Sequence, residues 1–77
     1  MNRTAQIRQF LGEHIAESIA DEDDIFARGL VSSMFVVQLV AFLEDNFDIQ
    51  IDGEDLVFES FRSVKDIDAL VQRLTGP

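Results

Sequence analysis

The fold of this chain is decided by the stretch Gly29-Leu30-Val31-Ser32-Ser33-Met34, followed at once by Phe35-Val36-Val37-Gln38-Leu39-Val40-Ala41-Phe42-Leu43-Glu44-Asp45-Asn46-Phe47. A turn that contains glycine delivers a serine to the start of a long apolar helix, which we expect to span Ser33 to Phe47. A hydroxyl at that position is exposed and lies at the positive end of the helix dipole, where backbone N–H groups favour an attached phosphate. We therefore predict that Ser33 is an attachment point and that the remaining chain is the scaffold that presents it.

Further helices are predicted on both sides of this segment. Before it, apolar residues recur at spacings of three and four, which predicts an amphipathic helix from about Thr4 to Ala20. After it, we expect an extended turn and a short helix near residues 54–58. A last helix is predicted to begin at Ser63, which can form a capping box with Asp66, and to end at Gly76-Pro77.

The connection between the first two helices is predicted to be long but ordered. Residues 21–24 are all acidic and stay in solvent, whereas Ile25, Phe26 and Leu30 can anchor the loop to the core. Three long helices and a short one make a small all-α four-helix bundle, a single domain over residues 1–77. The predicted core comprises Phe10, Leu11, Ile15, Phe26, Val37, Val40, Leu43, Phe47, Ile67 and Leu70, which leaves Phe35, Ala41 and Phe42 off the buried face of the second helix.

Composition excludes several classes of function. The chain has 77 residues, no cysteine and a net charge of −9, which argues against nucleic acid and anionic membranes as partners. The same charge favours partners that carry Lys/Arg patches. A core this small is unsuited to a deep catalytic cavity. We find no signal peptide and no run long enough to cross a bilayer, so we expect a cytoplasmic location.

Catalytic and metal-binding patterns are weak. The only histidine, His14, borders the stripe of the first helix, and nothing brings it to Ser33 as a base, so we do not expect an enzyme. Asp48, Gln50, Asp52, Gly53 and Glu59 have the spacing of a calcium-binding loop. Gln50 replaces the usual acid, Ile49 and Ile51 are apolar, and Leu56, Phe58 and Phe61 are expected in the core, so calcium sensing stands as a minor alternative.

With Ser33 singled out, the chain resembles the acyl and peptidyl carrier proteins. The resemblance lies in an acidic loop, a turn, a serine followed by Met34, and a helix of the pattern V-x-L-V-x-x-L-E-x-x-F from Val37 to Phe47. Residues 59–64 resemble the junction between the last two helices of that family, so the match covers essentially the whole chain. It implies that a phosphopantetheinyl transferase modifies Ser33 from coenzyme A. The thiol of the phosphopantetheine arm would then carry an acyl or aminoacyl thioester to partner enzymes.

Two departures from that family bear on the partners. Ser32 stands where the family usually has aspartate, which affects the choice of transferase. The early part of the second helix is apolar rather than acidic, which argues against a role in general fatty-acid synthesis. The form Gly29-Leu30-Val31-x-Ser33-Met34, with Gln38-Leu39 after it, resembles free-standing carriers, which include D-alanyl carriers and carriers of polyketide or nonribosomal peptide pathways. We expect a monomer that meets a loading enzyme (an adenylating enzyme or an acyltransferase) and downstream synthases. The partner surface is predicted to comprise Met34, Phe35, Gln38, Ala41, Phe42, Glu44 and Asp45.

Two interpretations compete with a modified carrier. Ser33 could be no more than a helix cap. The chain could also be an unmodified acidic interaction module that docks basic partners and never carries a prosthetic group. The mass of the protein after treatment with a transferase separates the carrier from the module.

Overall fold

The predicted all-α architecture is confirmed. The computed structural model describes residues 2–15 and 18–75, and within these ranges it contains helices and no strand. The elements in chain order are α1 (Arg3–His14), α2 (Ser33–Phe47), the 3-10 helix η1 (Gly53–Asp55), α3 (Phe58–Phe61) and α4 (Val64–Thr75).

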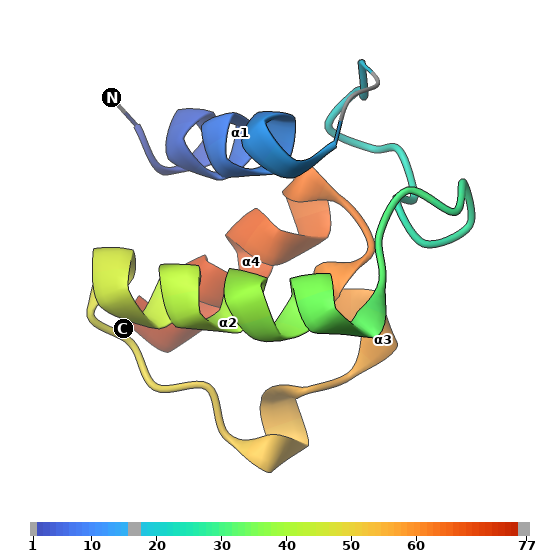
Figure 1. Cartoon of the computed structure of the whole chain (residues 1–77). Helices are drawn as coiled ribbons and strands as arrows, with labels where there is room; N and C mark the ends of the chain where they lie inside the picture. Colours follow the sequence, from blue (N-terminus) through green and yellow to red (C-terminus); the bar gives the residue numbers. More distant parts are fainter. Residues whose placement is uncertain (1, 16–17, 76–77) are drawn as a thin grey trace.

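The helices pack around a single core. In Figure 1, α1 and α2 lie one above the other and run in opposite directions, while α4 passes behind them. Helix α4 contacts α1, α2 and α3, so it is the central element of the bundle. The buried apolar residues come from every α-helix and from the connecting loops: Ile7, Leu11, Ile15, Ile25, Phe35, Leu39, Leu43, Ile51, Phe61, Val64, Ile67, Leu70 and Val71.

Helix α2 has the predicted bounds. Ser32 caps its N-terminus, since its side-chain oxygen accepts the backbone N–H of Phe35 at 3.4 Å. Asp48 ends the helix in the left-handed conformation, with φ of 53°. Left-handed backbone stops an α-helix, and aspartate is among the non-glycine residues that adopt it most readily.

The predicted rotation of α2 about its axis is wrong. Phe35, Leu39 and Leu43 form its buried face, whereas Val37, which we expected in the core, is 64% exposed. The cause is the aromatic ring of Phe10 on α1, which lies 4.3 Å from the ring of Phe42 and 5.8 Å from that of Phe35. Large rings bury more apolar surface than valine does, so they set which face turns inward. Of the other predicted core residues, Leu11, Ile15, Leu43, Ile67 and Leu70 are buried, and Phe10, Phe26, Val40 and Phe47 are partly buried against the core.

Helix α1 is shorter than predicted. It ends at His14, and Ile15 is already extended, with its N–H bonded to the Leu11 carbonyl. Residues 18–20 are not helical. The chain instead turns back, so that the Arg8 guanidinium reaches the Asp21 carboxylate at 2.8 Å. In an unbroken helix these two residues would lie about 20 Å apart along the axis.

Backbone hydrogen bonds hold the loop before α2. Ile25 is fully buried and donates its N–H to the Arg62 carbonyl at 2.8 Å, while Asp21 accepts the N–H of Lys65 at 2.9 Å. Phe26 and Leu30 are partly buried against the core, as predicted for anchors. Gly29 has φ of 69°, a conformation that favours glycine and turns the chain toward α2.

The segment after α2 differs from the prediction in the number and position of its short helices. Instead of one short helix near residues 54–58, the chain forms η1 and then α3, which begins at Phe58. The predicted cap of α4 by Ser63 is confirmed, because the Ser63 oxygen accepts the Asp66 N–H at 3.1 Å. The Asp66 carboxylate accepts the Ser63 hydroxyl at 2.8 Å, whereas in the predicted capping box it would accept the Ser63 backbone N–H. Helix α4 reaches Thr75, and the predicted Gly76-Pro77 end lies outside the described residues.

One ion pair joins the ends of the chain. The Arg3 guanidinium lies 2.6 Å from the Asp68 carboxylate, and the Thr4 hydroxyl donates to the same carboxylate. The hydrogen bond from Arg3 lowers the pKa of Asp68 below its usual value, because it stabilises the charged form. The pair therefore fixes the first turn of α1 on α4.

Candidate functional site

Ser33 is exposed and lies at the first position of α2. Its neighbour Ser32 provides the cap, and the hydroxyl of Ser33 has no hydrogen-bond partner among the described residues. The N–H groups of the first helical turn lack acceptors within the helix and give this end a partial positive charge. The cap interpretation therefore applies to Ser32, and it leaves the oxygen of Ser33 available for a covalent group.

The surface beside Ser33 is apolar. Met34 is 66% exposed and Val37 is 64% exposed, although both side chains are fully apolar. Helix α2 has no acidic residue in its first turn, so no carboxylate of this helix flanks Ser33 on that side. Soluble monomers leave few large apolar residues exposed next to one another, so this surface indicates a site that contacts a partner.

The predicted partner surface divides into exposed and packed residues. Met34, Gln38, Ala41 and Asp45 are exposed, as a docking surface requires. Phe35 is buried, with 7% of its surface exposed, and Phe42 is partly buried against Phe10. The two phenylalanines were expected to point outward, and the aromatic contacts with α1 explain the difference.

Glu44 has a structural contact at the other end of α2. Its carboxylate accepts the backbone N–H of Ile51 at 2.9 Å and ties the extended segment after the helix back to α2. Asp45, one residue further, is exposed. Only the second of these two acids presents a free carboxylate to a partner.

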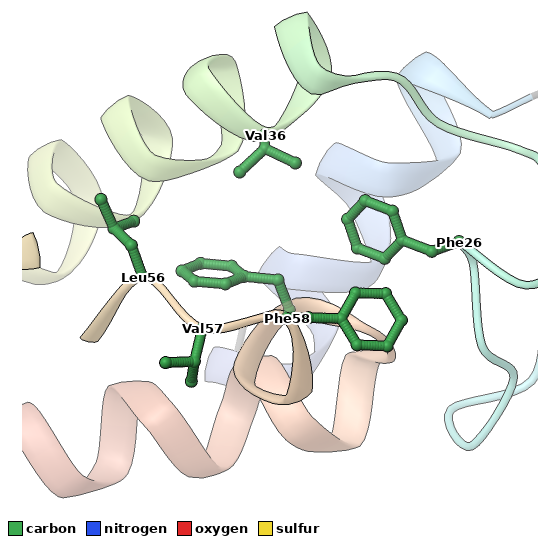
Figure 2. Close-up of a pocket in the computed structure, with 6 residues that line it drawn as sticks. Phe26, Val36, Leu56, Val57 and Phe58 are labelled. Carbon is green, nitrogen blue, oxygen red and sulfur yellow. The ribbon is translucent and has the colours of Figure 1, made fainter. Parts of the chain in front are cut away.

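An apolar pocket opens one helical turn from Ser33. It has a volume of about 190 Å³ and lies between α2, the preceding loop and α3. In Figure 2, Val36 points from α2 toward the side chains of the loop and α3, and Phe26 enters from the loop. The rings of Phe26 and Phe58 lie 5.1 Å apart. The lining residues are Phe26, Val36, Leu56, Val57, Phe58 and Phe61.

Sequence reasoning missed this pocket. Phe61 is buried as expected, but Leu56 is 51% exposed and Phe58 is 49% exposed, although both were expected in the core. Leu56 precedes α3, and α3 has only four residues, so no long helical face turns these side chains toward the core. The available signal was the run Leu56-Val57-Phe58, three consecutive apolar residues with no helical period after the acidic Glu54-Asp55.

The described residues offer no catalytic or metal-binding cluster. The Nδ1 atom of His14 lies 3.0 Å from the Phe10 carbonyl, and its ring packs on Phe35 at 5.4 Å. Over residues 2–15 and 18–75, no group of three or more His, Asp or Glu side chains is placed to hold a metal ion. In the segment that has the spacing of a calcium-binding loop, the Gln50 amide donates to Asp52, and Ile51 is buried.

No helix in the described part of the chain has the length and apolar character needed to span a membrane.

Comparison with known proteins finds small carrier proteins. The chain is 33% identical to the D-alanyl carrier protein of Leuconostoc mesenteroides subsp. mesenteroides, over 99% of this chain and 100% of that protein. It is 43% identical to the aminoacyl carrier protein of Agrobacterium fabrum, over 73% of this chain and 66% of that protein. It is 32% identical to the D-alanyl carrier protein of Leuconostoc citreum, over 92% and 94% of the two chains. No family model matches the chain.

Proposed function

Because this chain belongs to the carrier protein family that includes D-alanyl and aminoacyl carrier proteins, we propose that it carries an aminoacyl group on a phosphopantetheine arm attached to Ser33. Carrier proteins are not enzymes, so other proteins perform the chemistry on the group that is carried. The observation that supports the attachment site is the exposed Ser33 hydroxyl, left without a partner because Ser32 caps the helix.

The residues at the start of α2 fit the prosthetic group. A phosphodiester on the Ser33 oxygen would lie at the positive end of α2, where free N–H groups stabilise its negative charge. In the modification, the Ser33 oxygen forms a bond to the phosphorus of coenzyme A that bears pantetheine. The bond from that phosphorus to the adenosine bisphosphate breaks, and the transferase takes up the hydroxyl proton. When attached, the arm supplies a thiol that holds the aminoacyl group as a thioester.

The proposed partners follow from the cargo. A phosphopantetheinyl transferase attaches the arm, and an adenylating enzyme loads the amino acid. Both dock on the exposed side of α2, which offers Met34, Gln38, Ala41 and Asp45. The names of the relatives support an aminoacyl cargo. A role in polyketide or nonribosomal peptide biosynthesis remains a prediction from the form Gly29-Leu30-Val31-x-Ser33-Met34 with Gln38-Leu39 after it.

The experiment is modification with coenzyme A and a broad-specificity phosphopantetheinyl transferase, followed by intact mass measurement. We expect the wild-type chain and Ser32→Ala to gain the mass of one phosphopantetheine and Ser33→Ala to gain none. Circular dichroism of Ser33→Ala checks that it is folded. A wild-type chain that stays unmodified would favour the unmodified interaction module, and modification of Ser33→Ala would refute the assigned residue.

A further inference from the structure

We propose that the apolar pocket beside α2 receives an apolar side chain of the phosphopantetheinyl transferase and so anchors that enzyme over Ser33. This inference rests on the proposed attachment at Ser33. It assigns an occupant to the pocket lined by Val36, Leu56, Val57 and Phe58, together with Phe26 and Phe61.

The position of the pocket supports this occupant. The transferase must bring a phosphorus atom within about 3–3.5 Å of the Ser33 oxygen before the bond forms. Val36 follows Ser33 by three residues of the same helix, which is about 4.5 Å along its axis. A protein that docks on a surface of ordinary size, about 800 Å² per partner, and covers Ser33 therefore also covers the mouth of the pocket.

The chemistry of the pocket selects an apolar group. Every lining side chain is a valine, leucine or phenylalanine, and Leu56, Val57 and Phe58 are 51%, 43% and 49% exposed. An aminoacyl cargo carries an ammonium group, which would lose its hydration there without gaining a polar partner. The proposed cargo is thus a poor occupant, whereas an apolar anchor from a partner removes this surface from water, as the central contacts of protein interfaces do.

The acidic residues around the pocket indicate that basic residues of the transferase surround its apolar anchor. The first turn of α2 carries no acid, but Glu54 and Glu59 flank the apolar segment Leu56-Val57-Phe58 and are exposed. Basic side chains of the partner can meet these carboxylates at the rim. The transferase surface that fits is an apolar projection with Lys or Arg on the side that faces α3.

The test is the steady-state kinetics of modification with coenzyme A and a broad-specificity transferase. Leu56→Glu places a charge at the mouth of the pocket, at a half-exposed position that tolerates it. We expect the KM for the carrier to rise about tenfold with little change in kcat. Ala69→Glu, at an exposed position of α4 outside the pocket, makes the same change of charge and should leave the KM within about twofold. Leu56→Met, which keeps the position apolar, should retain the wild-type KM.

The outcomes separate this inference from the proposed function. If the wild-type chain is not modified at Ser33, the proposed function fails. If it is modified and Leu56→Glu, shown to be folded by circular dichroism, has the wild-type KM, only the anchoring role of the pocket is refuted. An equal rise of KM in Ala69→Glu would also refute it, since the effect would then be one of net charge.

A second measurement tests the cargo as the occupant. The chain is modified with the alanyl derivative of coenzyme A, and the amide resonances of Val36, Leu56 and Val57 are compared with those of the chain that carries the arm alone. We expect the alanyl group to leave these resonances unchanged. Shifts caused by the alanyl group would assign the pocket to the cargo and overturn the proposal.

Discussion

The two sides of α2 are both apolar, but one is closed and the other is open to water. Toward α1, the ring of Phe42 stacks on Phe10 at 4.3 Å and 22°, and Phe35 is 7% exposed. Toward α3, Val36 lines an apolar pocket, and Leu56 in the same lining is 51% exposed. Both sides of α2 are similarly hydrophobic, so the difference in burial comes from the side chains that the neighbouring helix packs against each side.

The physical difference lies in the size of the facing side chains and of the facing helix. Aromatic rings span the space between α1 and α2, so water is excluded there. On the open side, Val36 faces α3, which has only four residues and leaves an apolar pocket between the two helices. Apolar surface that stays in contact with water adds nothing to the stability of the fold. This open side is also the side that flanks the proposed attachment residue, Ser33. The closed side thus stabilises the fold, while the open side is available to partners.

The largest effect should come from removing an aromatic ring on the closed side. Phe35→Ala should lower the free energy of unfolding by about 3–5 kcal/mol, because it deletes a buried ring that contacts Phe10 and His14. Val37→Ala, at an exposed position of the same helix, should change it by less than about 0.5 kcal/mol. Urea unfolding followed by circular dichroism measures both. Equal losses in the two variants would break the distinction between the sides.

The next effect concerns the ion pair that holds α1 on α4. Helix α1 carries Phe10, whose ring packs against the closed side of α2. Asp68→Asn should cost about 1 kcal/mol at pH 7, because Arg3 loses its charged partner on α4. The pKa of Asp68 is lowered in the folded chain by the hydrogen bond from Arg3. The stabilisation is therefore fully present above the pKa of the unfolded chain, near 4, and is lost as the pH falls through the lower folded value.

The measurement is urea unfolding of the wild type and Asp68→Asn between pH 7 and pH 2. The difference between their unfolding free energies should shrink as the pH falls. The pKa of Asp21 is also lowered by its hydrogen bond from Arg8, so both chains should still lose stability in acid. A difference that stays constant down to pH 2 would show that the ion pair does not link α1 to α4 energetically.

The smallest effect distinguishes two adjacent acids at the end of α2. Glu44→Ala should cost about 0.5–1 kcal/mol, because the Ile51 N–H loses its acceptor. Asp45→Ala should be neutral or slightly stabilising, since it removes a negative charge from the negative end of the helix dipole. Thermal unfolding of the two variants in the same buffer makes the comparison. A loss in Asp45→Ala as large as that in Glu44→Ala would mean that both acids hold the fold.

Local signals were sufficient for some elements. The serine pair predicted the start of α2 correctly, and the Ser63–Asp66 pair predicted the start of α4. The stripe of α4 is unambiguous because Lys65 and Asp66 separate Val64 from Ile67, and Asp68 lies between Ile67 and the adjacent pair Leu70-Val71. All four apolar residues are buried. The family resemblance, which the relatives confirm, also followed from residues in these segments.

Other features depend on contacts between distant segments. From Met34 to Leu43 only Gln38 is polar, so the pattern cannot fix which face of α2 is buried, and the ring of Phe10 decides it. Helix α1 ends earlier than predicted because the following loop folds back and brings the Asp21 carboxylate to the Arg8 guanidinium. The pocket exists because α3 has only four residues. A helix this short leaves no repeating apolar pattern in the sequence from which the pocket could be predicted.

The two backbone hydrogen bonds of the long loop have a consequence for the timing of modification. Ile25 bonds to Arg62, and Asp21 bonds to Lys65, so the path that leads to Ser33 is held by residues near the C-terminal helix. Contacts this distant in sequence form only after the chain between them has been made. During synthesis, Ser33 emerges early but acquires its presented position only once residues 62–65 have left the ribosome. A transferase that recognises the folded loop would therefore act on chains from which residues 62–65 have emerged and pass over shorter nascent ones.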